Sequence, residues 1–266
     1  MAVRGVISYW WLPIFPACVW LGMLLGMLLW WFVTVDMDRS RLPSLDRDMY
    51  LPYISDIGAF TLKPLFIAGS VVTTVTFDLS FAAERWLRHK GRLVPNQTVL
   101  EKVLVVLTIL FAVVGTVGLI CLSIFDTYRH PKLHDMFLLL FIGGYLISAI
   151  FICWEYQRLG IQHREHRVLR ASFWVKLTFI FLELGLAIAF GVLTFTDRKN
   201  IAAYFEWIIS LIFTFYVLSF VIDLWPARRT KSRSMRFQKP TSPREMEESE
   251  ASLPGRVHGP NTNGHF

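Results

Sequence analysis

The chain has 266 residues, of which 54% are hydrophobic, 15% aromatic and only 18% charged. Soluble globular domains carry about 25% charged residues, so this composition excludes an ordinary water-soluble fold. The formal net charge is +7, and we expect membrane lipids rather than nucleic acid as partners of the basic residues.

Six apolar runs are each long enough to cross the hydrocarbon core of a bilayer, which needs about 20 residues of helix. Lipid offers the backbone no hydrogen-bond partner, so each run must be α-helical, and the alternation typical of a barrel strand is absent. The sequence therefore predicts an all-α membrane protein, a six-transmembrane-helix bundle formed by residues 1–225. The expected spans are 9–35, 62–83, 100–125, 133–156, 172–196 and 203–225.

The first run is predicted to be a permanent span rather than a removable signal peptide. It exceeds the apolar core of about 7–15 residues that such a peptide has, and Asp-Met-Asp follows it in place of a small-residue cleavage site. Trp pairs at both of its ends suit the two membrane interfaces. Gly22 and Gly26 have a spacing that favours close contact with another helix.

A polar turn, Leu-Pro-Tyr-Ile-Ser-Asp-Ile-Gly at residues 51–58, separates the first two spans. Its proline and glycine favour a bend in the chain. Tyr53, Ser55 and Asp56 supply two hydroxyl groups and a carboxylate. Two interpretations stay open: a turn that only leads into the second span, or part of a site that binds lipid or a partner.

Of the carboxylates within the predicted spans, Asp78 and Glu183 are the candidates for polar groups deep in the membrane, where charge is rare and often functional. Asp78 is in the second span, and we expect Arg85 or Arg88 to pair with it. Glu183 is near the middle of the fifth span. We expect Glu183 to be neutral and hydrogen-bonded to another helix. The alternatives are that it takes part in a proton relay, or that Asp78 and Glu183 mark a polar path through the membrane.

Acidic and imidazole side chains recur at the outer ends of the predicted spans. Convergent histidines and carboxylates can act as general bases or metal ligands, and the candidates for catalysis are Asp56, His134, Asp135 and Glu206. No metal or other cofactor is expected, His130 and His134 being weak candidates for a metal. The other interpretation is a set of helix caps, in which Asp135 complements the dipole of the fourth span from its first turn.

The distribution of basic residues predicts that both chain termini are cytoplasmic. With this orientation most of the 27 Lys and Arg residues fall on the cytoplasmic side. The sequon at Asn96 then also lies in the cytoplasm and is expected to stay unglycosylated. The three cysteines all lie within predicted spans and are not expected to form a disulfide framework.

Residues 226–266 are rich in Pro, Ser, Arg, Glu and Gly and are expected to form a disordered cytoplasmic tail. The tail begins with a basic cluster next to the last span, the kind of sequence that is attracted to anionic lipids such as phosphoinositides or phosphatidylserine. Alternatively, it only fixes the topology. The cluster consists of Arg228, Arg229, Lys231, Arg233, Arg236 and Lys239.

Three stretches carry a resemblance to a known family: Pro-Tyr-Ile-Ser-Asp-Ile-Gly at 52–58, His134-Asp135, and Glu206-Trp207 continued by Phe220 and Asp223. With the six spans, they resemble the Frag/DRAM/Sfk family, which includes the N-terminal domain of the Cwh-type proteins that remodel GPI-anchor lipids. The resemblance covers residues 5–225 and leaves out the tail.

This resemblance implies a role in membrane-lipid homeostasis. Similar members include a plasma-membrane protein that works with a phosphatidylinositol 4-kinase and influences phospholipid asymmetry, and in character the chain resembles these fungal Sfk-like lipid regulators. We therefore expect a non-enzymatic regulator or scaffold at the plasma membrane, with a phosphatidylinositol 4-kinase complex as a partner.

Two alternatives stay open. One is a GPI-anchor lipid remodelling factor with an exoplasmic hydrolase or transferase site. The other is a lipid transporter or scramblase. The alternative locations are the endoplasmic reticulum or Golgi and the vacuole or lysosome, since other family members act on lysosomes.

Overall fold

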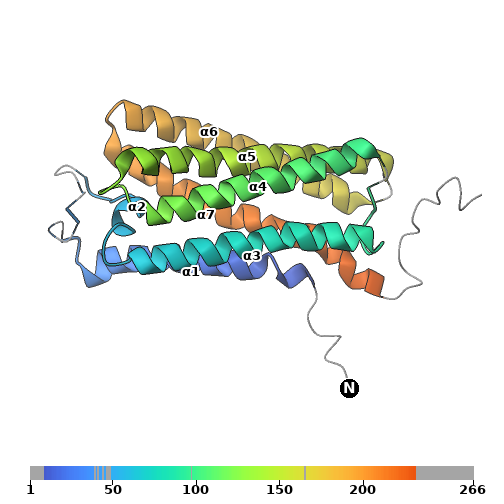
Figure 1. Cartoon of the computed structure of the whole chain (residues 1–266), viewed down its shortest axis with the longest axis horizontal. Helices are drawn as coiled ribbons and strands as arrows, with labels where there is room; N and C mark the ends of the chain where they lie inside the picture. Colours follow the sequence, from blue (N-terminus) through green and yellow to red (C-terminus); the bar gives the residue numbers. More distant parts are fainter. Residues whose placement is uncertain are drawn as a thin grey trace, which may run out of the picture.

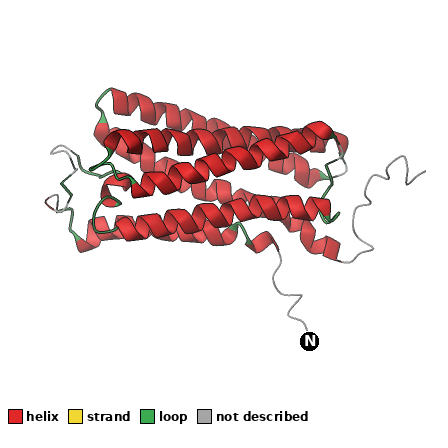
Figure 2. Ribbon diagram, viewed as in Figure 1, coloured by secondary structure: helices red, strands yellow, loops and turns green. Residues whose placement is uncertain are grey.

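The computed structural model describes residues 9–231 except 39, 41, 44, 46–48, 97 and 165. Within that part of the chain the regular elements are helices, and Figure 2 shows no strand among them. Six of the helices are long and apolar enough to cross a membrane. The prediction of an all-α bundle with six spans is therefore confirmed.

The first span is built from three consecutive helical pieces, and each later span is a single long α-helix. A short helix, α2 (Ile54–Ile57), lies between the first two spans. The pieces of the first span are η1 (Tyr9–Trp11), α1 (Ile14–Leu29) and η2 (Trp30–Thr34), and the later spans are α3 (Lys63–His89), α4 (Val99–Ile124), α5 (Pro131–Gln162), α6 (Arg167–Phe195) and α7 (Lys199–Leu224).

Both ends of the described chain meet at one end of the bundle, as an even number of spans requires. Trp10 of η1 packs against Trp225 of η4 (Trp225–Lys231), with ring centroids 5.2 Å apart. We call this the terminal end, and the opposite end, where α2 lies, the far end (Figure 1). Along the bundle α4 contacts α3 and α5, α6 contacts α5 and α7, and α1 contacts α3 and α7.

Helices α4 and α5 pack with their backbones in contact. A Cβ atom on Gly144 would lie 2.5 Å from the backbone nitrogen of Gly115, and one on Gly118 would lie 2.5 Å from that of Phe141. The Ser148 hydroxyl donates a 2.8 Å hydrogen bond to the Thr108 carbonyl oxygen across the same interface. Small residues permit this approach, which supplies packing that the hydrophobic effect does not supply inside lipid.

The glycines of the first span make no comparable contact. Among the described residues, Gly22 has no atom within 4 Å of an added Cβ, and at Gly26 the nearest atom is Cδ2 of Leu65 at 3.8 Å. On the helix facing α1, a Cβ on Gly69 would lie 2.3 Å from the Met23 sulfur. The close-contact prediction for Gly22 and Gly26 is therefore wrong: at this interface the small residue is on α3, and α1 supplies the large side chain.

Aromatic side chains fill the centre of the bundle between α3, α5 and α7. Phe77 is fully buried, and its ring centroid lies 5.1 Å from that of Phe220, 5.9 Å from that of Tyr145 and 6.1 Å from that of Tyr216. Edge-on arrangements such as those with Phe220 and Tyr216 are favourable for aromatic pairs. This core holds the two tyrosines beside the cavity described below.

Candidate functional site

The polar turn between the first two spans folds into a buried helix rather than an open loop. All four residues of α2 are buried. Tyr53 precedes the helix in an extended conformation, and its backbone N–H donates a 3.2 Å hydrogen bond to the Asp56 carboxylate. Asp56 thus acts in a capping box, which pairs backbone groups that a helix end leaves open.

Residues of α7 fix this turn to the bundle. The Glu206 carboxylate accepts a 2.8 Å hydrogen bond from the backbone N–H of Ile54. The indole N–H of Trp207 donates a 3.0 Å hydrogen bond to the carbonyl oxygen of Pro52. The carboxyl groups of Glu206 and Asp56 are close enough to interact electrostatically. The structure thus brings together the turn and the start of the last span, as the sequence suggested.

His134 belongs to a second group at the far end. Its side chain is buried, and its Nδ1 lies 2.9 Å from the carbonyl oxygen of Phe125, just past the end of α4. A carbonyl oxygen only accepts hydrogen bonds, so Nδ1 carries the hydrogen. His134 therefore satisfies one of the carbonyl groups that a helix C-terminus leaves open.

Asp126 in this second group lies between two cations. Lys63 donates to its carboxylate at 2.6 Å, and the backbone N–H of Arg129 donates at 2.7 Å. Burial alone would raise the pKa of this carboxyl, but these two hydrogen bonds and the charges of Lys63 and Arg129 outweigh burial and hold its pKa below the ordinary value.

The two remaining candidates at the far end have side chains at the surface. His130 and Asp135 are exposed. Because α5 begins at Pro131, earlier than predicted, Asp135 is not in the first turn and the proposed dipole role is wrong. Among the described residues, no three His, Cys, Asp or Glu side chains are grouped in a way that could hold a metal ion. The contacts thus separate two of the candidates, since Glu206 lies with Asp56 whereas His134 lies with Asp126.

An ion pair that the sequence analysis did not identify joins α6 to α7 near the terminal end. The side chains of Lys176 and Asp223 are both fully buried, and the ammonium group donates to the carboxylate. Ser172 donates to the same carboxylate and accepts a 3.0 Å hydrogen bond from Lys176. The ammonium also lies 4.1 Å from the ring centroid of Phe220. Phe220 and Asp223, quoted above for the family resemblance, are thus contacts of one buried lysine.

A second buried network lies beside this ion pair. Arg88 donates to the Glu84 carboxylate at 2.7 Å, and the Tyr156 hydroxyl donates to the same oxygen at 2.6 Å. Asn96 Nδ2 donates to the Glu155 carboxylate at 2.7 Å, which engages the nitrogen that a glycan would need. The i,i+4 spacing of Glu84 and Arg88 could have predicted their ion pair from the sequence. The contacts of Tyr156 and Asn96 join distant parts of the chain and could not be predicted from a single sequence.

Asp78 has a different partner from the predicted arginines. The Thr116 hydroxyl of α4 donates a 2.7 Å hydrogen bond to its carboxylate. That hydroxyl is also 2.7 Å from the Tyr145 hydroxyl, which must then be the donor between the two. The prediction of an arginine partner fails because α3 continues to His89, which places Arg88 among the groups of the terminal end.

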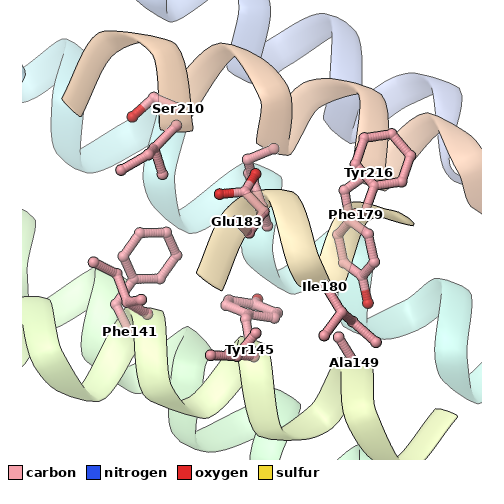
Figure 3. A pocket seen from close by; sticks show the side chains of 12 residues that line it. Phe141, Tyr145, Ala149, Phe179, Ile180, Glu183, Ser210 and Tyr216 are labelled. Atoms are coloured by element: carbon pink, nitrogen blue, oxygen red, sulfur yellow. The ribbon is translucent and has the colours of Figure 1, made fainter. Parts of the chain in front are cut away.

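Tyr145 also lines a cavity of about 70 Å³ between α5, α6 and α7. Figure 3 shows the Glu183 carboxyl group in this cavity, with Ser210 and Tyr145 near it. Glu183 Oε1 is buried and has no hydrogen-bond partner among the described residues, so the expected bond to another helix is not found there. Most of the lining is apolar, with Phe141, Ile142, Leu146, Ala149, Phe179, Ile180, Ile209 and Phe213 as the remaining members besides Tyr216.

Only the start of the predicted basic cluster can be placed. The Arg228 guanidinium is exposed and lies 5.5 Å from the ring centroid of Trp225 at the terminal end. The side chains of Arg229 and Lys231 lie outside the described part of the structure, and so do Arg233, Arg236 and Lys239.

Six apolar helices, ion pairs turned into the bundle and a carboxyl group in an apolar cavity define an integral membrane protein. The chain matches the model of the Frag1/DRAM/Sfk1/Cwh43P N-terminal domain over residues 8–227 and belongs to that family.

Two curated relatives are similar to this chain. Protein sfk1 of Schizosaccharomyces pombe is 30% identical over 214 residues, which cover 80% of this chain and 64% of the relative. Protein SFK1 of Saccharomyces cerevisiae is 25% identical over 177 residues, which cover 56% of this chain and 48% of the relative. The chain therefore spans less than two thirds of either relative. No solved structure matches it significantly.

Proposed function

We propose that the protein is a non-enzymatic regulator or scaffold of phosphoinositide synthesis and phospholipid asymmetry at the plasma membrane. Membership of the Frag1/DRAM/Sfk1 family supports a role in lipid homeostasis. The proposal of a non-enzymatic role rests on one observation: the polar side chains at the far end hydrogen-bond to backbone groups of the protein itself. Glu206 accepts from Ile54, and His134 bonds to the Phe125 carbonyl oxygen.

This use of the polar groups argues against the alternative of a hydrolase or transferase in GPI-anchor remodelling. A general base must reach the proton that it removes, directly or through one water. The electrostatic neighbours of His134 are Asp126 and Asp135, whereas that of Glu206 is Asp56. The proposed enzymatic site would need His134 beside Asp56 or Glu206, and neither of them is among its electrostatic neighbours within the described residues.

The tail supplies the proposed contact with lipids or a recruited kinase complex. In the proposed topology the terminal end faces the cytoplasm, so the basic cluster starts at the membrane surface directly after α7. Basic residues near an anionic leaflet contribute about 1 kcal/mol each. The proposed partners are phosphoinositides or phosphatidylserine and a phosphatidylinositol 4-kinase complex.

The test is neutralisation of the six basic residues of the cluster to glutamine. We expect the full-length variant to lose binding to liposomes that contain phosphatidylinositol 4-phosphate, and cells that carry it to show less of this lipid at the plasma membrane. The control replaces three exposed arginines at the same end: Arg164 on the connection between α5 and α6, and Arg167 and Arg170 at the start of α6. Unchanged lipid levels in the cluster variant would contradict the proposal.

A second candidate function, lipid transport or scrambling, is favoured by a specific observation. Asp78, Thr116 and Tyr145 form a chain of hydrogen bonds from α3 to α5, and Tyr145 lines the cavity that holds Glu183. Polar groups inside a membrane protein often mark a substrate path. In liposomes with a fluorescent phospholipid, the purified protein should accelerate transfer between leaflets, and Glu183→Gln should slow it. No transfer above empty liposomes would exclude this candidate.

A further inference from the structure

An open groove lies at the far end, beside the start of α3. Its volume is about 800 Å³, and it is lined by residues 59–60, Lys63, Pro64, Ile67, Ala68 and Arg129. Ligand sites in proteins have volumes of about 300–1,000 Å³. One wall belongs to α3 and the residues before it, and Arg129 comes from the connection between α4 and α5.

The charges in the groove suit an anion. Lys63 Nζ is 2.6 Å and Arg129 Nη1 is 3.7 Å from the same oxygen of Asp126. The Asp126 side chain is only 2% exposed, whereas those of Lys63 and Arg129 are 22% and 65% exposed. The carboxylate thus holds two cations side by side from the buried side, and the three groups together present one net positive charge to the groove. Arginine and lysine are the side chains that most commonly bind phosphate.

An apolar stripe on α3 begins in the groove and runs along the helix towards the terminal end. Pro64 and Ala68 line the groove and are exposed, and Val72, Val75 and Leu79 follow at intervals of three or four residues and are exposed too. Residues at this spacing share one face of a helix. Phe60 packs against Tyr128 at 5.3 Å between ring centroids, which places an aromatic wall at the level of the cations. Aromatic rings are typical of the interface between headgroups and acyl chains.

We propose that this groove binds a glycerophospholipid, with its phosphodiester against Lys63 and Arg129 and one acyl chain along the stripe of α3. Cations and an aromatic wall at one level, followed by an apolar stripe along α3, match the order of headgroup and acyl chain in such a lipid. The proposal extends the proposed lipid-regulatory function by naming a lipid site at the end opposite the basic cluster. It concerns binding alone, so its failure would leave the test of phosphoinositide levels unaffected.

The experiment is photolabelling of the full-length protein in nanodiscs. The probe is phosphatidylglycerol with a diazirine in one acyl chain, and the control probe is diacylglycerol with the same chain but no phosphate. We expect phosphatidylglycerol to label the segment 64–79 strongly and diacylglycerol to label it weakly. Labelled peptides are quantified by mass spectrometry.

Variants then separate phosphate recognition from simple exposure to lipid. Arg129→Gln should lower labelling by phosphatidylglycerol about fivefold, the effect of removing one basic side chain from an anionic membrane surface, and Lys63→Gln/Arg129→Gln should lower it further. Lys132→Gln, an exposed charge at the same end outside the groove, should leave it unchanged. If the double variant does not fold, Arg129→Gln alone decides. Equal labelling by both probes, or full labelling of Arg129→Gln, would overturn the proposal.

Discussion

Lys176 and Asp223 form an ion pair whose side chains are both fully buried between α6 and α7. Few other buried residues hold α6 in place, since only Leu169, Ser172, Lys176 and Ile180 of this helix are buried. The pair therefore fixes the position of the helix that carries Glu183. Removing one partner leaves the other charge without compensation, which destabilises proteins by about 3–5 kcal/mol.

We therefore expect Lys176→Met to lower the thermal unfolding temperature markedly in detergent. The double variant Lys176→Met/Asp223→Leu should recover much of the loss, because both charges are then absent. Lys199→Met is the control, since its ion pair with Asp197 is largely exposed and such pairs contribute about 0.2–1 kcal/mol. Equal stability of Lys176→Met and Lys199→Met would contradict the structural role.

The contact between Glu206 and Ile54 gives a prediction about the far end. Glu206→Ala leaves the Ile54 N–H without its acceptor, and an unsatisfied buried donor is unfavourable by about 1–3 kcal/mol. Glu206→Gln keeps an oxygen that can accept this bond. Hydrogen exchange of residues 51–58 should accelerate in the alanine variant and stay near the wild-type rate in the glutamine variant. Acceleration in both would mean that the carboxylate charge, not the hydrogen bond, holds α2.

The Asp126 carboxyl predicts a dependence of stability on pH. Its pKa is lower in the folded protein than the ordinary value of 3.8, so the ion pair with Lys63 stabilises the fold above about pH 4. This stabilisation is lost as the pH falls through the lower, folded-state pKa. The difference in unfolding temperature between wild type and Asp126→Asn should be largest near neutral pH and shrink towards pH 3. A constant difference would show that Asp126 contributes no charge-dependent stability.

The spans were predictable because a long apolar run must cross the membrane as a helix whatever its neighbours are. The ends of two spans were harder to predict. Glu84 and Arg88 end the apolar run of the second span, yet α3 continues to His89 because these side chains are buried against one another. Helix α5 likewise continues to Gln162, beyond the predicted end at residue 156. A charged side chain that is paired with an opposite charge does not end a helix. A hydropathy profile does not show which charged residues are paired.

The candidate site was predictable only in part. The turn and Glu206 were expected at one rim, and their hydrogen bond bears this out. His134 was expected to join them, but it caps α4 instead. Which helices are neighbours cannot be inferred from apolar periodicity in a membrane protein, because the faces towards lipid and protein are both apolar. For the same reason the sequence did not show that Lys176 and Asp223, both charged residues within predicted spans, are partners.

The interface of α4 and α5 allows a comparison of two adjacent glycines. A Cβ on Gly144 would lie 2.5 Å from the backbone of Gly115, which cannot move without separating the helices. A Cβ on Gly143 would have no atom of the described residues within 4 Å. Gly144→Ala should therefore destabilise the bundle, and Gly143→Ala should be neutral or stabilising by up to about 1 kcal/mol because alanine favours helix. Thermal unfolding of both variants in the same detergent measures the contrast. If the two variants have equal unfolding temperatures, the helices do not pack backbone to backbone, because only Gly144 meets the facing helix in that arrangement.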